Sequence, residues 1–415
     1  MRETNQKVLI FHSDYGEGHR HAALALAQAL GELNDQLYIQ VADFMRDTHP
    51  FLHIVMRRTF FSALRYFPAA YRLAYQKTKE AKRAPLLEHF TALGVKRMAT
   101  YVQTFDPDVI VSTHPFAAQG MAYLKRLGYL DVPLFTVMTD HTDHRFWLSE
   151  GTDMYLVSSD VLKARLIAQG IPESRVMATG IPIEPRFAAL PKKHVARSML
   201  QLPEKNGMIL IMGGGMGMMD DAEALVKALL SLQERFTVIF IAGHNERLRK
   251  KLSIWRAQSL PLEDMHRLVI TGFTKDIALF MAASDMIITK PGGLTTSEAI
   301  ASKLPMILFK PLPGQEEDNA LFLSELGVAR MARSIDDVVH HVHTFWHEPL
   351  MMKALQDQLQ RMDFGRAAYE AATLILQSLS RPKVRRILSQ EEEREAYGVE
   401  ILDDFGDVLP KHGTS

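Results

Sequence analysis

Two adjacent glycines between an apolar run and a helix-like segment form the part of the chain best suited to chemistry. The segment runs from Thr289 to Ala299, with the pair at Gly292 and Gly293. Glycines at a strand tip leave the N–H groups of the next helix start accessible, and the positive end of the helix dipole adds to their attraction for a diphosphate. Glu298, one turn further, can accept hydrogen bonds from both hydroxyls of a ribose. The pattern predicts a nucleotide-sugar site.

A second polar loop strengthens this prediction. Two glycines before a helix also fit a tight turn, so the first segment alone leaves both interpretations open. One short strand later, Pro313 to Asn319 form a loop rich in acidic and amide side chains. Ligands of parallel sheets bind at the carboxyl ends of the strands, where both loops are expected. The pair of loops therefore favours ligand binding over a turn.

The other glycine-rich loops exclude the commoner nucleotide-binding folds. Gly16 and Gly18 follow the first strand, but no third glycine completes a dinucleotide fingerprint. The run from Gly213 to Gly217 lacks the Lys-Ser/Thr pair of a P-loop. Neither a Rossmann dehydrogenase nor a P-loop NTPase fits. Asp106-Pro107-Asp108 matches the D-x-D metal-diphosphate pattern, but the proline favours a turn.

Composition indicates a two-domain enzyme of the reducing cytoplasm. The 415 residues exceed what one hydrophobic core usually organises, and 47% of them are apolar. Because the chain has no cysteine, disulfides, thiolate metal sites and cysteine nucleophiles are excluded. The formal net charge is zero, so attraction to nucleic acid or membrane has to come from a local patch. No apolar run is long enough to span a bilayer, and the polar start is not a signal peptide, so we expect neither export nor a membrane span.

Short apolar runs alternate with amphipathic segments, which predicts parallel sheets covered by helices on both faces. The rhythm restarts after a proline-rich stretch near residue 185, so we expect two Rossmann-like domains with a cleft between them. The predicted strands are Lys7–Phe11, Tyr38–Ala42, Val109–Ser112, Leu134–Met138, Met154–Val157, Met208–Met212, Thr237–Ala242, Leu268–Thr271, Met286–Thr289 and Met306–Phe309. The predicted helices include Ala22–Leu33, Ala117–Leu127, Ser159–Gln169, Ala222–Leu232 and Asn245–Arg256.

A series of motifs in order resembles one family of inverting glycosyltransferases. The family contains plant monogalactosyldiacylglycerol synthases, bacterial processive diacylglycerol beta-glucosyltransferases and, more distantly, the lipid II-forming N-acetylglucosaminyltransferase. The resemblance spans about Val8 to Asn319, with closing helices to about Leu379. Its motifs are Gly16-Glu17-Gly18-His19-Arg20, Thr139-Asp140-His141 followed by Trp147, Thr179-Gly180-Ile181-Pro182-Ile183, Met212-Gly213-Gly214-Gly215, Thr271-Gly272-Phe273, Pro291-Gly292-Gly293-Leu294-Thr295 and Pro313-Gly314-Gln315-Glu316.

The resemblance implies a GT-B type fold with divided labour. Residues 1–185 would bind the acceptor, 186–365 the UDP-sugar, and 366–382 would form a closing helix; the charged residues 383–415 would be a mobile tail without an assigned role. No metal or other cofactor is required, because backbone dipoles would neutralise the leaving diphosphate. The donor residues implied by the motifs are Gly272 and Phe273 for the uracil, Glu298 for the ribose, Gly214, Gly215, Gly292, Gly293, Leu294 and Thr295 for the diphosphate, and Gln315 and Glu316 for the sugar.

His19 is our candidate for the general base. An imidazole that titrates near neutrality on a glycine loop facing the cleft can take the proton of an attacking hydroxyl. A solvent-facing histidine at a helix start is the alternative. Asp140 could orient His19 or act as the base, or simply cap a helix. His141 and His144 resemble a metal pair, but without a third ligand a polar loop is favoured.

Residues 44–101 combine cations with aromatic side chains, which suits a surface that lies on anionic lipid. An ordinary helix pair with aromatic residues in its core is the alternative. A nucleic-acid surface fits less well, because no nucleic-acid motif is present. The residues expected to meet membrane or acceptor are Arg57, Arg58, Phe60, Phe61, Arg65 and Arg72.

The family resemblance implies a function in glycolipid synthesis. Glucose, or galactose, would move from UDP-glucose or UDP-galactose to the 3-hydroxyl of diacylglycerol, with processive addition as an option. The chain would be cytoplasmic and attached peripherally to the inner face of the membrane. The alternatives are a UDP-GlcNAc-dependent transferase acting on a polyprenyl-linked peptidoglycan precursor and a non-catalytic nucleotide-sugar sensor. The presence of both His19 and Asp140 favours an enzyme over a sensor.

Overall fold

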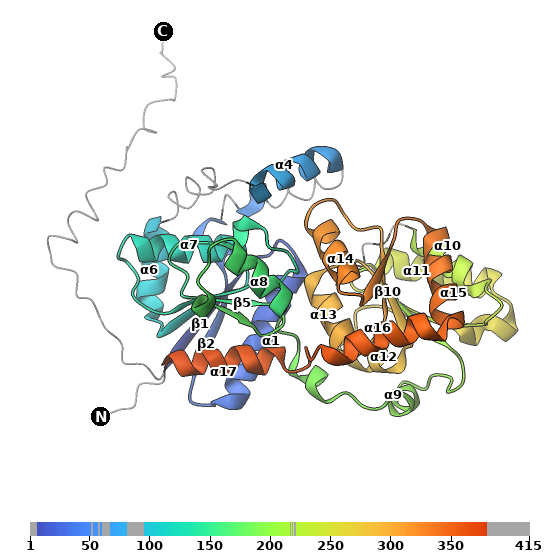
Figure 1. Ribbon diagram of the computed structural model, residues 1–415. Helices are drawn as coiled ribbons and strands as arrows, with labels where there is room; N and C mark the ends of the chain where they lie inside the picture. Colours follow the sequence, from blue (N-terminus) through green and yellow to red (C-terminus); the bar gives the residue numbers. More distant parts are fainter. Residues whose placement is uncertain are drawn as a thin grey trace, which may run out of the picture.

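The structure is a computed structural model that describes residues 6–50, 53–56, 59, 67–80, 95–215, 217, 219 and 221–379. Within these residues, two six-stranded sheets lie side by side, each with helices on both faces (Figure 1). Every strand pair is parallel. The predicted pair of parallel α/β domains is confirmed.

The first sheet has the strand order β2-β1-β3-β4-β5-β6. Its central strands are runs of apolar residues that are buried on both faces, as a sheet between two helical layers requires. The strands are β1 (Lys7–His12), β2 (Tyr38–Asp43), β3 (Val109–Ser112), β4 (Leu134–Val137), β5 (Met154–Val157) and β6 (Val176–Ala178). The helices are α1 (Glu17–Leu33), α2 (Phe44–Thr48), α4 (Pro68–Glu80), α6 (Val95–Phe105), α7 (Pro115–Arg126) and α8 (Asp160–Ala168).

The second sheet has the order β12-β11-β10-β7-β8-β9. Its strands are β7 (Met208–Met212), β8 (Thr237–Ile241), β9 (Leu268–Thr271), β10 (Met286–Thr289), β11 (Met306–Phe309) and β12 (Ala329–Ala332). Its helices are α9 (Lys193–Met199), α10 (Ala222–Leu230), α11 (Glu246–Ser259), α12 (Ile277–Ala283), α13 (Gly293–Ala301), α14 (Gln315–Glu325), α15 (Ile335–His347) and α16 (Pro349–Arg361).

Two details differ from the sequence prediction. The edge strands β6 and β12 were not predicted, because β6 has only three residues and β12 carries Arg330, so neither is a continuous apolar run of strand length. Helix α1 begins at Glu17 instead of Ala22, so His19 lies in its first turn and not on a loop. The polar residues of that first turn carry no apolar periodicity, which is why pattern alone placed the start too late.

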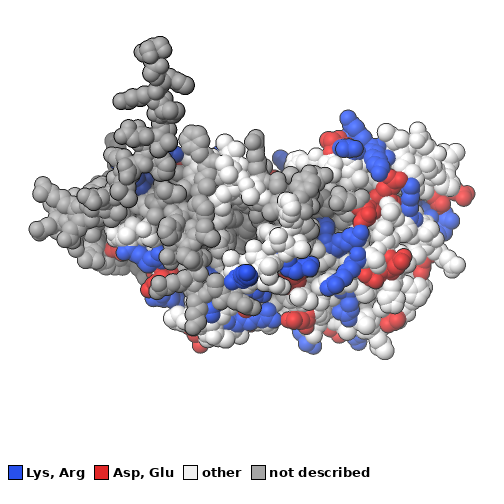
Figure 2. Space-filling model, turned by 90° about the horizontal axis from the view of Figure 1, so that it is seen from above, with Lys and Arg blue, Asp and Glu red and all other residues white. Residues whose placement is uncertain are grey.

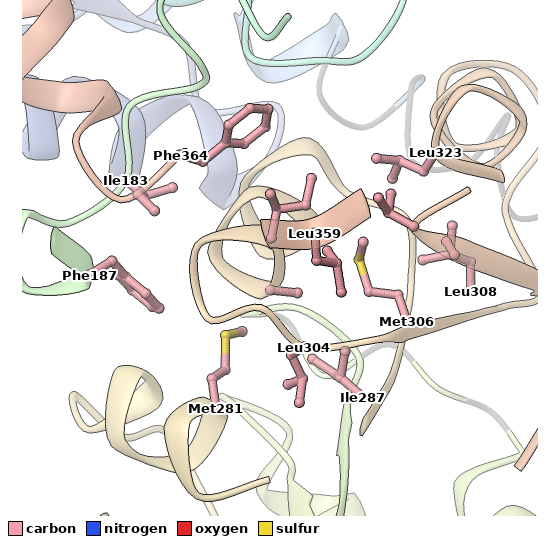
Figure 3. Close-up of a cluster of buried hydrophobic side chains, with 14 of the residues drawn as sticks. Ile183, Phe187, Met281, Ile287, Leu304, Met306, Leu308, Leu323, Leu359 and Phe364 are labelled. Carbon is pink, nitrogen blue, oxygen red and sulfur yellow. The ribbon is translucent and has the colours of Figure 1, made fainter. Parts of the chain in front are cut away.

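One buried hydrophobic cluster joins the two domains. Figure 3 shows Ile183 and Phe187, from the connection between the sheets, on the same cluster as Leu359 of α16 and Phe364. The cluster also contains Met306 of β11, from the interior of the second domain. The domains therefore share apolar packing along part of their junction.

The last described helix, α17 (Ala367–Leu379), returns to the first domain. It runs along α1 (Figure 1), and its buried Ala368, Ala371 and Ile375 share a core cluster with β1 and β3. The end of the chain thereby completes the core of the first domain. Among the helices that the structure describes, none is long and apolar enough to span a membrane.

Replacing Leu359 by alanine tests the shared cluster. Leu359 is fully buried, so Leu359→Ala should lower the free energy of unfolding by about 2–5 kcal/mol through lost burial and the cavity left behind. Leu350 on the same helix is 85% exposed, and Leu350→Ala should change stability by less than about 0.5 kcal/mol. Urea denaturation of both variants measures these changes in the free energy of unfolding. Equal changes for the two variants would show that burial of Leu359 in the shared cluster adds no stability beyond that of an exposed leucine.

Candidate active site

One group of polar residues follows the carboxyl ends of three neighbouring strands of the first sheet. Strands β1, β3 and β4 are adjacent, and their carboxyl ends lead to His19, Thr113 and Thr139. Because the strands are parallel, these residues meet at the same edge of the sheet. Asp140 follows Thr139 directly and is 4% exposed. The candidate base and its rival therefore lie close together, as part of one cluster.

The hydrogen bonds of His19 fix which ring nitrogen can act as a base. Its Nδ1 lies 2.9 Å from the Thr113 carbonyl oxygen and 2.7 Å from Thr139 Oγ1. A carbonyl can only accept, so Nδ1 carries the proton that it donates to Thr113. The lone pair is then on Nε2. The Thr113 hydroxyl donates back to the His19 carbonyl at 2.9 Å, which holds the two chain segments together.

Burial favours the uncharged form of this imidazole. Desolvation lowers the pKa of His19 below its ordinary value, while the negative charge of Asp140 and the hydrogen bond to Thr113 act in the opposite direction. His114, whose ring centroid is 4.6 Å from that of His19, also has a pKa well below its ordinary value because of burial and the neighbouring histidines. His19 is thus neutral at physiological pH, as a proton acceptor must be.

The predicted diphosphate segment faces this cluster across the domain junction. Gly292 caps α13, and a Cβ added to Gly293 would lie 2.0 Å from the Thr139 carbonyl oxygen. Only glycine permits this approach of two backbones. The start of α13, with its free N–H groups and positive dipole end, therefore lies beside Asp140. Leu294 and Thr295 continue the same turn.

Glu298 is a buried carboxyl in the second turn of α13. Among the groups that the structure describes, none donates a hydrogen bond that would stabilise its charge. Desolvation, with a smaller contribution from the charge of Glu184, raises the pKa of Glu298 to about 8. A buried carboxyl without donors is suited to a ligand that supplies two hydroxyl groups, as the predicted ribose does.

The residues predicted for the diphosphate and the uracil outside α13 lie at the carboxyl ends of β7 and β9, with the loop after β8 between them. Gly215 packs against the loop after β8, where the His244 N–H donates to its carbonyl at 3.0 Å. Gly214 has φ +70°, so its backbone conformation favours glycine. The Phe273 ring beside Gly272 is half exposed and stacks on His244, with centroids 4.4 Å apart. A stacked aromatic pair of this kind offers a flat surface on which a nucleobase such as uracil can stack.

Gln315 and Glu316 begin α14, after β11. The Glu316 carboxylate accepts a hydrogen bond from the Leu312 N–H at 2.7 Å, and burial raises its pKa. Further along α14, Asn319 links the domains: its Oδ1 accepts from the His141 N–H at 2.8 Å and its Nδ2 donates to the Pro291 carbonyl at 2.9 Å. The two predicted donor loops are therefore tied directly to the strand end that carries Asp140.

The structure also places residues that sequence reasoning did not select. Thr113, His114 and His244 contact predicted site residues, and Asn319 bonds to His141 and Pro291, each of which is next to a predicted site residue. The sequence does hold a signal for the first two, because Thr113 and His114 follow a buried strand at the edge where ligands of parallel sheets bind. Asn319 belongs to the polar loop that the sequence marks, but its link to the other domain could not be predicted, because its partner His141 is 178 positions away.

Most residues predicted to meet the membrane lie outside the described residues, as does the predicted tail 383–415. These membrane residues are Arg57, Arg58, Phe60, Phe61 and Arg65. Arg72 is described, and it pairs with Glu317 of the second domain, with its Nη2 2.6 Å from Oε1. On the face in Figure 2, the described Lys and Arg side chains are interspersed with Asp and Glu. The membrane role of Arg72 stays a prediction.

The histidines after β4 have protein partners. His141 Nε2 lies 3.0 Å from Thr296 Oγ1, and His144 Nε2 lies 3.2 Å from the Tyr75 carbonyl oxygen. Burial lowers the pKa of His141 to about 4. Elsewhere in the described chain, one group could hold a metal ion: its ligand atoms, within 4.8 Å of one another, come from Glu234, His343 and His347. Glu234 precedes β8, so this group lies at the opposite edge of the second sheet from the candidate site.

Fold and site together define a two-domain nucleotide-sugar glycosyltransferase, and comparison with known proteins agrees. Residues 19–183 match the family described as monogalactosyldiacylglycerol (MGDG) synthase, and residues 208–372 match the glycosyltransferase family 28 C-terminal domain. A relative from Bacillus subtilis (strain 168), named processive diacylglycerol beta-glucosyltransferase, is 30% identical over 360 residues, which cover 86% of this chain and 90% of the relative. The chain belongs to this family of diacylglycerol glycosyltransferases.

Solved structures with low sequence identity share the fold. The crystal structure of Acinetobacter baumannii MurG is 16% identical, with a TM-score of 0.55 over 90% of this chain and 99% of that one. The glycosyltransferase of kitacinnamycin is 13% identical, with a TM-score of 0.58 over the same shares of the two chains. The GT-B type architecture predicted from the sequence is thereby confirmed.

Replacing His19 tests its role as base. His19→Ala should lower turnover by about 100-fold to 10,000-fold, because a positioned general base is typically worth that much. UDP binding should be unchanged, since the nucleotide would bind the other domain. His21→Ala, on the same helix, is the matched control and should leave turnover nearly unchanged. Steady-state rates with detergent-dispersed diacylglycerol measure the turnover of both variants. Near-normal turnover of His19→Ala would show that His19 is not the general base.

Glu298 should couple nucleotide binding to proton release. Below pH 8 the free carboxyl holds a proton, and a carboxylate that accepts two ribose hydrogen bonds must lose it. UDP affinity should therefore rise about fiftyfold between pH 6 and pH 8, because the deprotonated fraction of a carboxyl with a pKa of about 8 grows from about 1% to about half, and it should level off above pH 8. Glu298→Gln cannot ionise, so it serves as the control for titration of the phosphate itself and should lack this rise. Calorimetry in buffers of different ionisation enthalpy measures the released proton; identical pH profiles for both proteins would place the ribose elsewhere.

Proposed function

We propose that this enzyme transfers glucose, or less readily galactose, from its UDP donor to the 3-hydroxyl of 1,2-diacylglycerol with inversion at the anomeric carbon. The observation that carries the proposal is the neutral His19, with its Nε2 lone pair available, opposite the start of α13. The choice of lipid acceptor and of glucose is supported by the name of the Bacillus subtilis relative. That name also motivates a processive reaction, in which the sugar of the product supplies the next attacking hydroxyl.

The reaction would be a single displacement. His19 Nε2 accepts the proton of the acceptor hydroxyl as its oxygen forms a bond to the anomeric carbon. The bond from that carbon to the β-phosphate oxygen breaks, and UDP leaves. The backbone N–H groups of Gly293, Leu294 and Thr295 stabilise the developing negative charge. Asp140, 4% exposed and near His19, stabilises the imidazolium that forms.

Exposed apolar side chains support an acceptor that is part of a lipid layer. Ile54, Val55, Phe67 and Leu73 are each more than half exposed, and all four belong to the described parts of the segment 44–101. Large apolar groups on a surface are suited to the headgroup and acyl boundary, with neighbouring cations on anionic headgroups. We therefore propose that the enzyme works peripherally on the inner face of the cell membrane, with this segment toward the lipid.

A donor and acceptor panel tests the function. Purified protein is mixed with vesicles that contain diacylglycerol and, separately, with UDP-glucose, UDP-galactose or UDP-GlcNAc. We expect mono- and diglucosyl products by mass spectrometry, β-anomeric linkage by NMR, and rates that EDTA leaves unchanged, because backbone groups hold the diphosphate. A polyprenyl-diphosphate acceptor is the counter-test. Transfer of GlcNAc alone, to that acceptor alone, would overturn the proposal, and nucleotide binding without any transfer would favour a sensor.

A further inference from the structure

Helix α4 belongs to the segment expected to face lipid, yet one side of it is fastened to the second domain. The Arg72 guanidinium forms two hydrogen bonds to the Glu317 carboxylate, of 3.0 and 2.6 Å. One and two turns further along the helix, the Tyr75 hydroxyl and the Lys79 ammonium both donate to Asp318 Oδ2, at 3.2 and 2.6 Å. Bidentate arginine pairs carry geometric specificity as well as energy, so α4 is held in one register against α14.

The acidic partners lie at the start of α14, directly after Gln315 and Glu316. Glu317 also accepts a hydrogen bond from the Gly314 N–H at 3.2 Å, so the carboxylate bound by Arg72 caps the helix as well. Asp318 receives a further hydrogen bond from the Thr142 hydroxyl at 2.9 Å. The first turn of α14 is thus held from two sides, by α4 and by the loop after β4.

Next to these ion pairs, two tyrosines of α4 pack against Gly314, which precedes α14. Gly314 has φ +90°, and a Cβ there would lie 2.9 Å from Tyr71 Cε1 and 3.1 Å from the Tyr75 ring. The tyrosines of α4 therefore lie directly on the glycine that precedes the sugar-binding pair. Burial, with the negative charges of Asp140 and Glu316, raises the pKa of Tyr71 to about 12. The Tyr71 hydroxyl is thus within electrostatic reach of both the predicted catalytic carboxylate, Asp140, and the predicted sugar carboxylate, Glu316.

We propose that α4 is a positioning element of the donor site: Arg72 and Lys79, through Glu317 and Asp318, hold Gln315 and Glu316 in place for the sugar of the donor. The inference rests on the proposed function, because it requires these two residues to contact that sugar. It assigns α4 a second role beside lipid contact. Phe67 and Leu73 of this region are exposed while Tyr71 and Tyr75 are half-buried against α14, so one helix connects the lipid side with the sugar side.

The proposal predicts a selective loss of affinity for the sugar. In the variant Arg72→Gln/Lys79→Gln, the dissociation constant of UDP-glucose should rise about tenfold, while that of UDP should stay within twofold. UDP lacks the group that Gln315 and Glu316 bind. Lys77→Gln is the matched control, because Lys77 is exposed on the same helix and has no ion pair within the described residues; it should leave both constants unchanged. Calorimetry on the full chain, without acceptor, measures all values.

A double-mutant cycle isolates the ion pair. Glu317→Gln keeps an oxygen that can accept the hydrogen bond of the Gly314 N–H, but it loses the charge. Because both changes break the same ion pair, the double variant Arg72→Gln/Glu317→Gln should lower the affinity for UDP-glucose no more than either change alone. Additive losses, unchanged UDP-glucose affinity in every variant, or equal losses of UDP and UDP-glucose would each overturn the proposal. Wild-type protein that binds UDP-glucose no better than UDP would instead defeat the proposed sugar contact, and this inference with it.

Discussion

The close approach of Gly293 to the Thr139 carbonyl is the constraint on which the rest of the site depends. The first turn of α13 and the chain after β4 meet where a methyl group would not fit. Thr139 also contacts the ring of His19, so the start of the helix and the candidate base share a neighbour. The separation between the start of α13, the predicted diphosphate site, and the chain that carries the partner of His19 is therefore set by two backbones.

Burial at this junction shifts the pKa values of two side chains in opposite directions. Burial lowers the pKa of His19 and raises that of Glu298, so each side chain is uncharged in the free enzyme at neutral pH. The site thus holds few uncompensated charges before its substrates arrive. Donor binding would create one charge, at Glu298, and acceptor deprotonation the other, at His19. Each charge would form only when its hydrogen-bond partner or counter-charge is present.

The sequence predicted the parallel α/β architecture and many strand boundaries, because strands such as Met208–Met212 and Val109–Ser112 are continuous apolar runs. It also placed the glycine pair and Glu298, whose spacing around a strand end and a helix start is local. Contacts that depend on distant parts of the chain were not predictable. Arg72 and Glu317 are 245 positions apart, and Arg72 as a residue type fits a lipid surface equally well. The helix start at Glu17 was missed because polar residues conceal it.

The return of α17 has a consequence for exchanging parts between related enzymes. This helix follows the second domain in the chain but completes the core of the first, against α1. The second domain is therefore an insertion into the first in terms of packing, with two crossing points instead of one. A chimera that grafts a foreign donor half would preserve the host core only by replacing about 208–361 and keeping the host's own Ala367–Leu379. A single crossover near residue 185 would pair α1 with a foreign helix.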